Sequence, residues 1–205
     1  MWKLVEEKDL KYFRFTYENK VFLYSTRIGT QKFLDIFKPL FLKQIHSAII
    51  VNIDTETKRT GDGILTAGNK SIGVKIADCL PVYIFSGDKM MILHCGWRSI
   101  YKGILRRARG LLKNYHYVLG AGIGVCCYEV KNDVASLYYA RYPEAVVNRN
   151  GRLFLDLKKA VQSELGLSSL MADLNYCTYC HPHYFYSHRR GDKERNYAVL
   201  FSTRE

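Results

Sequence analysis

The sequence lacks any apolar run of the ~18 residues that a membrane-spanning helix needs. No export signal is expected at the start, because Glu6 and Glu7 lie where a signal peptide would have its apolar stretch. No repeat, low-complexity tract or Pro/Gly/Ser-rich linker interrupts the 205 residues. We therefore expect residues 1–205 to form a single domain of the cytoplasm, with no membrane partner.

Disulfides are not expected, because the six cysteines would lie in a reducing compartment. They are interpreted as thiols or metal ligands. The neighbours Cys126 and Cys127 are poorly placed for a disulfide with each other.

A second group of cysteines forms the segment Cys177-Thr178-Tyr179-Cys180-His181-Pro182-His183. Structural zinc, a redox pair and ordinary buried thiols are the alternatives. A closed zinc site would need both thiols and both imidazoles within seven residues, which strains tetrahedral geometry. We therefore predict that this segment is not a second metal site, and its role stays open.

The net charge of +12 favours anionic partners such as phosphate or nucleic acid. The basic residues are spread along the whole chain, which is typical of a solvated surface. No recognised nucleic-acid-binding motif is present, so a basic nucleic-acid-binding domain is a minor alternative. Small molecules are the expected partners.

Aromatic and β-branched residues predict a hairpin at 11–17 and 21–25, with a turn at 18–20. Further strands are expected at 48–53, 63–66, 71–76, 81–85 and 90–94. Helices are expected at 99–113, 130–142 and 156–165, the last with Asp156 as its N-cap and Gly166 just past its end. This irregular interleaving favours an α/β or α+β domain with a mixed or antiparallel sheet.

Three places predicted at or near strand ends carry a residue that binds borderline or soft metals: His46, Cys79 and His94. Imidazole and thiolate together suit zinc, and three protein ligands leave a fourth position for water, whose pKa zinc lowers to about 7. The spacing alone does not show that these residues converge, and buried packing is the competing interpretation.

Phosphate binding is predicted at Arg98, which begins a helix after an apolar strand, and at the pair Arg189-Arg190 beside a turn. Surface arginines without a ligand are the alternative at both places. Asp62 is the candidate carboxylate for general acid–base catalysis. The alternative is that Asp62 is only a turn residue between two glycines. Asp78 and Glu129 lie near the same motifs. The glycine-rich run at 120–124 fits neither a Walker motif nor a dinucleotide fingerprint, and is interpreted as a tight backbone passage under a site.

The order of these motifs resembles one bacterial family. The segments that carry the resemblance are Gln44-Ile45-His46, Gly61-Asp62-Gly63, Ala77-Asp78-Cys79-Leu80-Pro81, His94-Cys95-Gly96-Trp97-Arg98, Cys127-Tyr128-Glu129-Val130 and Phe185-Tyr186-Ser187-His188-Arg189-Arg190. The family was once named multicopper polyphenol oxidoreductase or laccase, and is now described as purine nucleoside phosphorylases of the YfiH type.

The resemblance implies a single-domain α/β/β/α sandwich with mixed sheets. It implies a metal site at His46, Cys79 and His94, with zinc as cofactor and copper as a further possibility. It also implies phosphorolysis of inosine, guanosine, adenosine and methylthioadenosine, together with adenosine deamination. We assign Asp62 and Arg98 as catalytic residues, and Arg98, Arg189 and Arg190 to substrate or phosphate binding.

The sequence departs from the family pattern in a few places. Cys95 replaces the usual Ala, Ser99 the usual Gly, and Ala121 and Val125 replace prolines. Lys193-Glu194-Arg195 stands where Thr-Gly-Arg is common. None of these changes falls on a proposed metal ligand.

Two other enzyme classes are alternatives. A copper-binding polyphenol oxidase of the multicopper type needs roughly ten imidazoles, whereas this chain has six His. A Cys-dependent hydrolase would use Cys79 as nucleophile, activated by His46 or His94.

Overall fold

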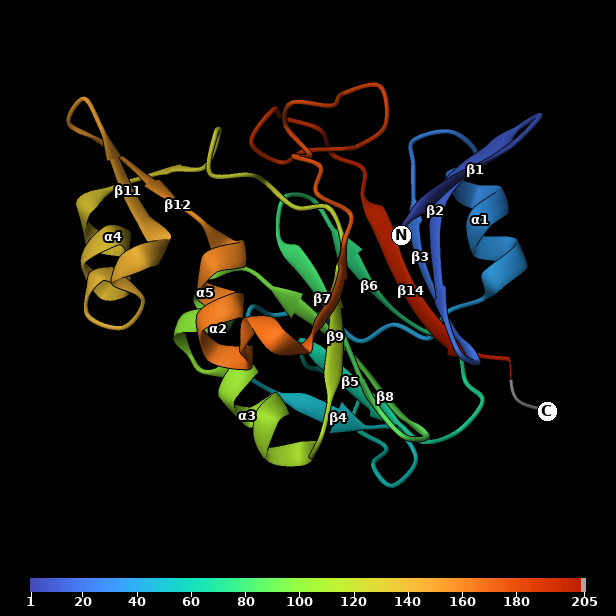
Figure 1. Cartoon of the computed structure of the whole chain (residues 1–205). Helices are drawn as coiled ribbons and strands as arrows, with labels where there is room; N and C mark the ends of the chain where they lie inside the picture. The colour runs from blue at the N-terminus through green and yellow to red at the C-terminus, as the bar shows by residue number, and fades with distance from the viewer. Residues whose placement is uncertain (204–205) are drawn as a thin grey trace.

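Two β-sheets lie face to face in the centre of the molecule, and helices lie against their outer faces (Figure 1). The computed structural model describes residues 1–203. The first sheet has the order β1 (Lys3–Glu7), β2 (Leu10–Tyr17), β3 (Lys20–Ser25), β14 (Asn196–Ser202) and β6 (Ile72–Ile76). The second has the order β13 (Leu170–Asp173), β9 (His116–Leu119), β7 (Leu80–Ser86), β8 (Lys89–Cys95), β5 (Gly63–Thr66) and β4 (Ile50–Asn52).

Strand alternation explains why the two sheets stack. In β7, Val82 and Ile84 point to the helical side of the second sheet, whereas Tyr83 and Phe85 point to the first sheet. Successive side chains of a strand face opposite sides, so a strand that is apolar at every position is buried on both faces. The second sheet is therefore an inner layer.

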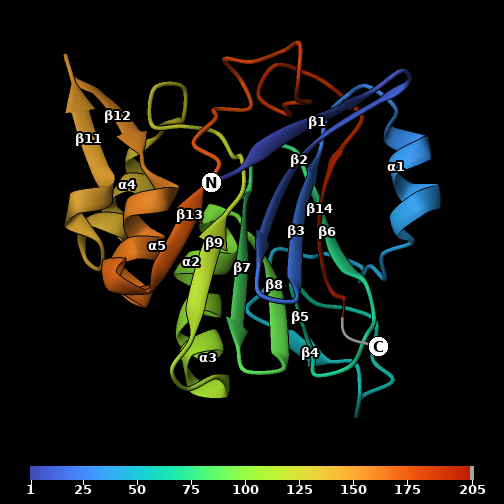
Figure 2. The same ribbon diagram turned by 45° about the vertical axis from the view of Figure 1, so that its right-hand side comes forward.

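Helices cover both outer faces (Figure 2). On the first sheet, α1 (Thr30–Phe37) packs through Phe33 against the outward side chains of β2 and β3. On the second sheet, the cover is made by α2 (Trp97–Tyr101), α3 (Ile104–Leu111) and α5 (Leu157–Leu165). The order of layers is helix, sheet, sheet, helix, which confirms the expected mixed α/β sandwich.

A smaller lobe extends the helical layer. It contains β10 (Glu129–Val130), β12 (Arg152–Leu155) and β11 (Val146–Arg149), which form a three-stranded sheet, together with α4 (Asn132–Tyr139). The single turns η1 (Pro143–Ala145) and η2 (Leu167–Ser169) join neighbouring elements. Tyr128 precedes this lobe, so the lobe borders the site described below.

Several expected elements are confirmed. The hairpin of β2 and β3 lies where the sequence predicts it, and the Asp156 side chain caps α5 by accepting a hydrogen bond from the Lys159 amide at 3.1 Å. Among the described residues, no helix is long and apolar enough to cross a membrane.

One expected element is wrong. The helix predicted over 99–113 is broken into α2 and α3, because Gly103 adopts a left-handed conformation with φ of 92° between them. Such a conformation ends a right-handed helix and favours glycine. As a result, α2 is only five residues long.

Candidate metal centre and anion-binding cavity

The imidazoles of His46 and His94 and the thiol of Cys79 lie together, with one donor atom from each within 4.8 Å of the others. Strand pairing explains the meeting of two of them. β7 and β8 are antiparallel, with Leu80 opposite Cys95, so Cys79 and His94 lie at the same end of neighbouring strands. His46 comes from the loop before β4, and its Nε2 lies 3.8 Å from the Cys79 sulfur.

Asp62 lies next to the three donors and positions two of them, His46 and His94. Its Oδ1 is 2.9 Å from His94 Nδ1 and accepts the amide of His46 at 3.0 Å. Its Oδ2 accepts the Ser47 amide at 2.6 Å and the Ser47 hydroxyl at 2.7 Å. The carboxylate thus fixes the His94 ring, leaving Nε2 free to face the other donors, and also bends the loop that presents His46.

The loop at His46 is held in an uncommon conformation. His46 has a φ of 53°, in the left-handed region that non-glycine residues seldom adopt. Three backbone groups fasten it: the amides of residues 46 and 47 donate to Asp62, and the His46 carbonyl accepts the Lys102 ammonium at 2.9 Å. Strain of this kind persists only where surrounding contacts fix it, and it is typical of functional sites.

The charges of the cluster reinforce one another. Burial alone would raise the pKa of the Cys79 thiol, but the His94 and His46 imidazoles outweigh it and the pKa is lowered. Burial alone would lower the pKa of His94, but the Cys79 thiolate and Asp62 raise it. For Asp62, hydrogen bonds from His94 and Ser47 outweigh burial, and its pKa lies far below the usual range. The cluster therefore favours a thiolate at Cys79 and a carboxylate at Asp62.

The donor set fits a metal ion. One thiolate and two imidazoles are the ligand types that zinc prefers, and they leave a fourth position open. The pairing of His94 with Asp62 is the carboxylate–histidine arrangement that usually orients a metal-bound imidazole. Gly96 leaves the necessary space, because a Cβ atom there would lie 2.8 Å from the Cys79 sulfur.

A cavity of about 700 Å³ opens above these donors. Its wall is basic and aromatic. The residues that line it include His46, Cys79, His94, Trp97, Arg98, Tyr128, His188, Arg189 and Arg195. This volume lies in the range of small-molecule sites.

Two of the three arginines predicted to bind phosphate line this cavity. The Arg98 guanidinium stacks on the Trp97 ring, with its carbon 4.5 Å from the ring centroid. Within residues 1–203 it makes no hydrogen bond or ion pair, so its N–H donors are available. Because α2 has only five residues, the affinity for an anion must come from this guanidinium and not from a helix dipole.

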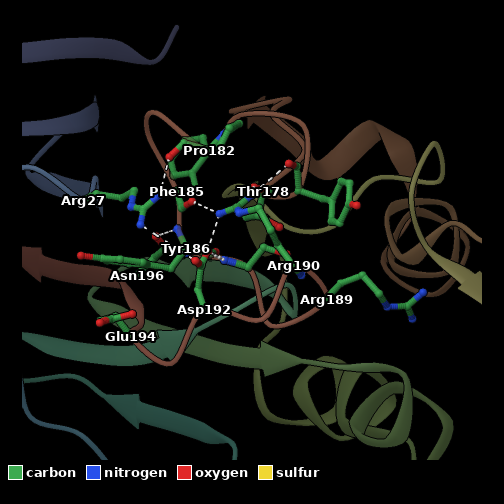
Figure 3. Close-up of polar contacts among 12 residues, drawn as sticks. Arg27, Thr178, Pro182, Phe185, Tyr186, Arg189, Arg190, Asp192, Glu194 and Asn196 are labelled. Atoms are coloured by element: carbon green, nitrogen blue, oxygen red, sulfur yellow. Dashed lines mark hydrogen bonds and ion pairs between the residues drawn. The ribbon is translucent and has the colours of Figure 1, made fainter.

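Arg189 and Arg190 differ in what they contact (Figure 3). The Arg189 side chain extends away from the loop, over the Tyr128 ring, and one of its N–H groups donates to the Glu129 carbonyl at 3.0 Å. Arg190 instead donates to the carbonyls of Thr178, Tyr179 and Phe185 and pairs with Asp192. Its guanidinium holds the loop together, which leaves little donor capacity for a substrate.

The remaining carboxylates near the cavity are also engaged. Asp78 accepts the Thr178 hydroxyl and the Arg189 amide, each at 2.7 Å. Glu129 pairs with Arg152 on the surface. The glycine-rich run passes under Asp78 and Leu80, since a Cβ at Gly122 would lie 3.1 Å from the Leu80 Cα.

The model of the family described as multi-copper polyphenol oxidoreductase laccase matches residues 22–200. The chain belongs to this family. A purine nucleoside phosphorylase of Aquifex aeolicus is 30% identical over 154 residues, which cover 69% of this chain and 72% of that protein.

Solved structures confirm the fold of this laccase-family chain. A protein of Neisseria meningitidis, NMB0706, matches with a TM-score of 0.83 at 22% identity over 93% of this chain and 98% of that one. The protein YfiH of Bacillus licheniformis matches with a TM-score of 0.80 at 21% identity over 98% and 99%. The resemblance drawn from the sequence motifs is thereby confirmed.

Sequence reasoning missed some residues that line the cavity of this laccase-family chain, namely Arg195, His188 and Tyr128. Tyr128 and His188 lie inside the motifs that carry the resemblance, and Arg195 stands where the family pattern also has Arg. Their position in or beside those motifs could have identified them as site residues, whereas their side-chain types alone could not.

Proposed function

We propose that this protein is a metal-dependent purine nucleoside phosphorylase that also deaminates adenosine. The observation that carries the proposal is the joining, in one cavity, of the donors His46, Cys79 and His94 with the free guanidinium of Arg98. The naming of the relatives as purine nucleoside phosphorylases supports it. The proposed substrates are inosine, guanosine, adenosine and methylthioadenosine.

Zinc is the metal we propose at His46, Cys79 and His94, with copper as a possible substitute. When bound there, the ion supplies a Lewis acid and a water of lowered pKa. Asp62 acts as a positioning residue, because its carboxylate is buried behind His94 and all its hydrogen bonds run to the protein. This differs from the direct acid–base role assigned from the sequence.

Phosphorolysis requires a dianion beside the ribose, and Arg98 with Arg189 provides the donors. Arginine matches phosphate bidentately. The Trp97 ring fixes the plane of the Arg98 guanidinium, which reduces the entropy lost when an anion is bound. Arg190 supports the loop that carries Arg189 and does not itself contact phosphate in this proposal.

The oxidase alternative receives no support from the described residues. Within residues 1–203, the groups of His, Cys, Asp and Glu side chains close enough to hold a metal are the His46 group and a second group made of cysteines only. A three-copper cluster needs many imidazoles, and His116 is instead packed against Tyr17 and Phe85.

The test uses inosine with and without phosphate, followed by chromatography of the products. Release of hypoxanthine should depend on phosphate and should yield ribose 1-phosphate. Adenosine without phosphate should still give inosine, because deamination needs only water. Equal cleavage of inosine without phosphate would identify a hydrolase. Activity that survives complete metal removal would support the Cys79 nucleophile instead.

A pair of arginine variants tests the phosphate site. Arg98→Ala should lower phosphorolysis about ten- to a hundredfold, from the loss of a charge-assisted contact of about 1.5–3 kcal/mol. Adenosine deamination should change much less. Arg107→Ala is the matched control, since Arg107 is an exposed arginine on the neighbouring helix α3. Equal loss of both activities in Arg98→Ala would show that Arg98 maintains the site and does not select phosphate.

A further inference from the structure

Four cysteines lie together next to the end of the glycine-rich run 120–124. Cys126 and Cys127 follow that run, and Cys177 and Cys180 lie fifty or more residues later. Their sulfur atoms all lie within 4.8 Å of one another. The Cys127 and Cys180 sulfurs are 3.2 Å apart, and the Cys126 and Cys180 sulfurs are 3.6 Å apart.

These separations fit one tetrahedral ion. With Zn–S bonds of about 2.3 Å, the sulfurs of a tetrahedral site lie about 3.8 Å apart. A disulfide needs sulfurs at about 2.05 Å and joins only two of the four. All four cysteines are free thiols in the structure. The arrangement therefore has the size and the number of donors of a closed structural site.

The backbone also places hydrogen-bond donors on one of the four sulfurs. The Gly124 amide donates to the Cys177 sulfur at 3.2 Å, and the Cys180 amide also donates to it. Amide hydrogen bonds of this kind stabilise a sulfur that carries negative charge, as a metal-bound thiolate does. Gly124 leaves room for this approach, because a Cβ there would lie only 3.2 Å from the Cys177 Cβ.

The backbone also fixes the two halves of the group relative to each other. Gly122 and Cys177 form a parallel bridge, and the Thr178 amide donates to the Gly122 carbonyl at 3.0 Å. The four sulfurs are thus brought together by contacts that do not depend on the sulfurs themselves.

We propose that Cys126, Cys127, Cys177 and Cys180 bind one zinc ion in a structural site separate from the His46, Cys79 and His94 centre. The prediction that segment 177–183 holds no metal site considered only ligands from within it, whereas the sulfurs of Cys126 and Cys127 lie beside those of Cys177 and Cys180. Two ligands come from 126–127, and the imidazoles are not needed: the His181 Nδ1 lies 2.9 Å from the Cys177 carbonyl.

This site ties two segments that build the cavity. Tyr128, in the cavity wall, directly follows Cys127. Thr178, between the other two cysteines, donates its hydroxyl to Asp78, whose second oxygen accepts the Arg189 amide. A zinc ion there would hold the wall that carries Tyr128 and Arg189. Cys126 and Cys180 are exposed, so metal can enter without unfolding of the core.

The experiment measures metal content and coordination in the full chain, purified under reductant. The wild type should contain about two zinc ions, one for each ligand set. Cys79→Ala removes a ligand from the other centre and should retain about one zinc, whose X-ray absorption spectrum should show four sulfur neighbours at about 2.3 Å. Cys126→Ser combined with Cys180→Ser should also retain about one zinc, with a mixed nitrogen and sulfur shell. Cys95→Ala is the control, because Cys95 is a buried thiol outside both groups.

The outcomes separate the alternatives. A four-sulfur shell in Cys79→Ala supports the proposal even if the double serine variant fails to fold. Absence of zinc from Cys79→Ala overturns it. So does a wild-type mass that is lower by two hydrogens under reductant, which would mean that a disulfide occupies the group. Neither result depends on the phosphorolytic activity, so the proposed function stands or falls separately.

Discussion

Replacing Asp62 by Asn tests whether this carboxylate controls the metal centre. The amide keeps the shape of the side chain but loses the charge, and one of its two ends can no longer accept hydrogen bonds. If that end replaces Oδ1, the His46 amide and His94 Nδ1 lose their acceptor. If it replaces Oδ2, the amides of Ile45 and Ser47 lose theirs, while the Ser47 hydroxyl can rotate and accept from the new amide group.

The lost contacts give the expected size of the effects on stability and on zinc affinity. Two buried donors left without an acceptor cost about 1–3 kcal/mol each, so the free energy of unfolding should fall by about 2–6 kcal/mol. Loss of the partner that orients a metal-bound imidazole typically weakens metal binding ten- to a hundredfold, which is about 1.4–2.8 kcal/mol. Zinc affinity should fall in either orientation of the new amide, because the negative charge beside His94 is lost in both.

Two assays separate the effects. Competition with a chromophoric chelator gives the zinc affinity, and urea unfolding of metal-free protein gives the stability. Asp54→Asn is the matched control, because Asp54 also accepts a backbone amide, from Ala67, and a hydroxyl, from Thr66, in a loop away from the site. The control should lose stability and keep its zinc affinity. Unchanged zinc affinity in Asp62→Asn would refute the positioning role.

Three further predictions concern single residues. Cys79→Ala should abolish zinc binding at the His46 centre, measured as the loss of about one zinc per chain; full occupancy would show that the ligand set is wrong. Gly96→Ala should lower the zinc content with little change in the circular dichroism spectrum, because its φ of −82° suits alanine while the added Cβ would lie 2.8 Å from the Cys79 sulfur. Gly110→Ala, where a Cβ meets nothing within 4 Å, is its control. For Glu164, burial would raise the pKa, but hydrogen bonds from Tyr142 and Arg141 lower it overall. Its stabilising contribution should therefore be present above its ordinary pKa of 4.5 and be lost as the pH falls through the lower folded-state pKa. The difference in unfolding free energy between wild type and Glu164→Gln should accordingly shrink from pH 7 to about pH 3, and a constant difference would contradict it.

The sequence by itself determined the local elements whose causes are local. The hairpin of β2 and β3 follows from alternating aromatic and β-branched residues around a short turn, and the start of α5 follows from the Asp156 cap. The order of the motifs was enough to identify the family and to select His46, Cys79 and His94 as the residues to examine together.

Other features depended on contacts between distant segments, which no local pattern encodes. Gly103 was expected inside a helix, since an apolar stripe continues across it, but its left-handed conformation breaks that helix. Arg189 and Arg190 are neighbours of one type, and only the carbonyls around Arg190 distinguish their roles.

The two cysteine pairs show most clearly what the sequence alone cannot predict. Each pair has too few ligands to hold a zinc ion by itself, and spacing along the chain cannot show that 126–127 and 177–180 meet. The bridge between Gly122 and Cys177 brings them together, and Asp62 acquires its partner His94 in a similar way, through the backbone bond from the His94 amide to the Asp62 carbonyl. Residue types and their order are properties of the sequence, whereas convergence comes from sheet pairing and chain packing, which only the tertiary structure decides.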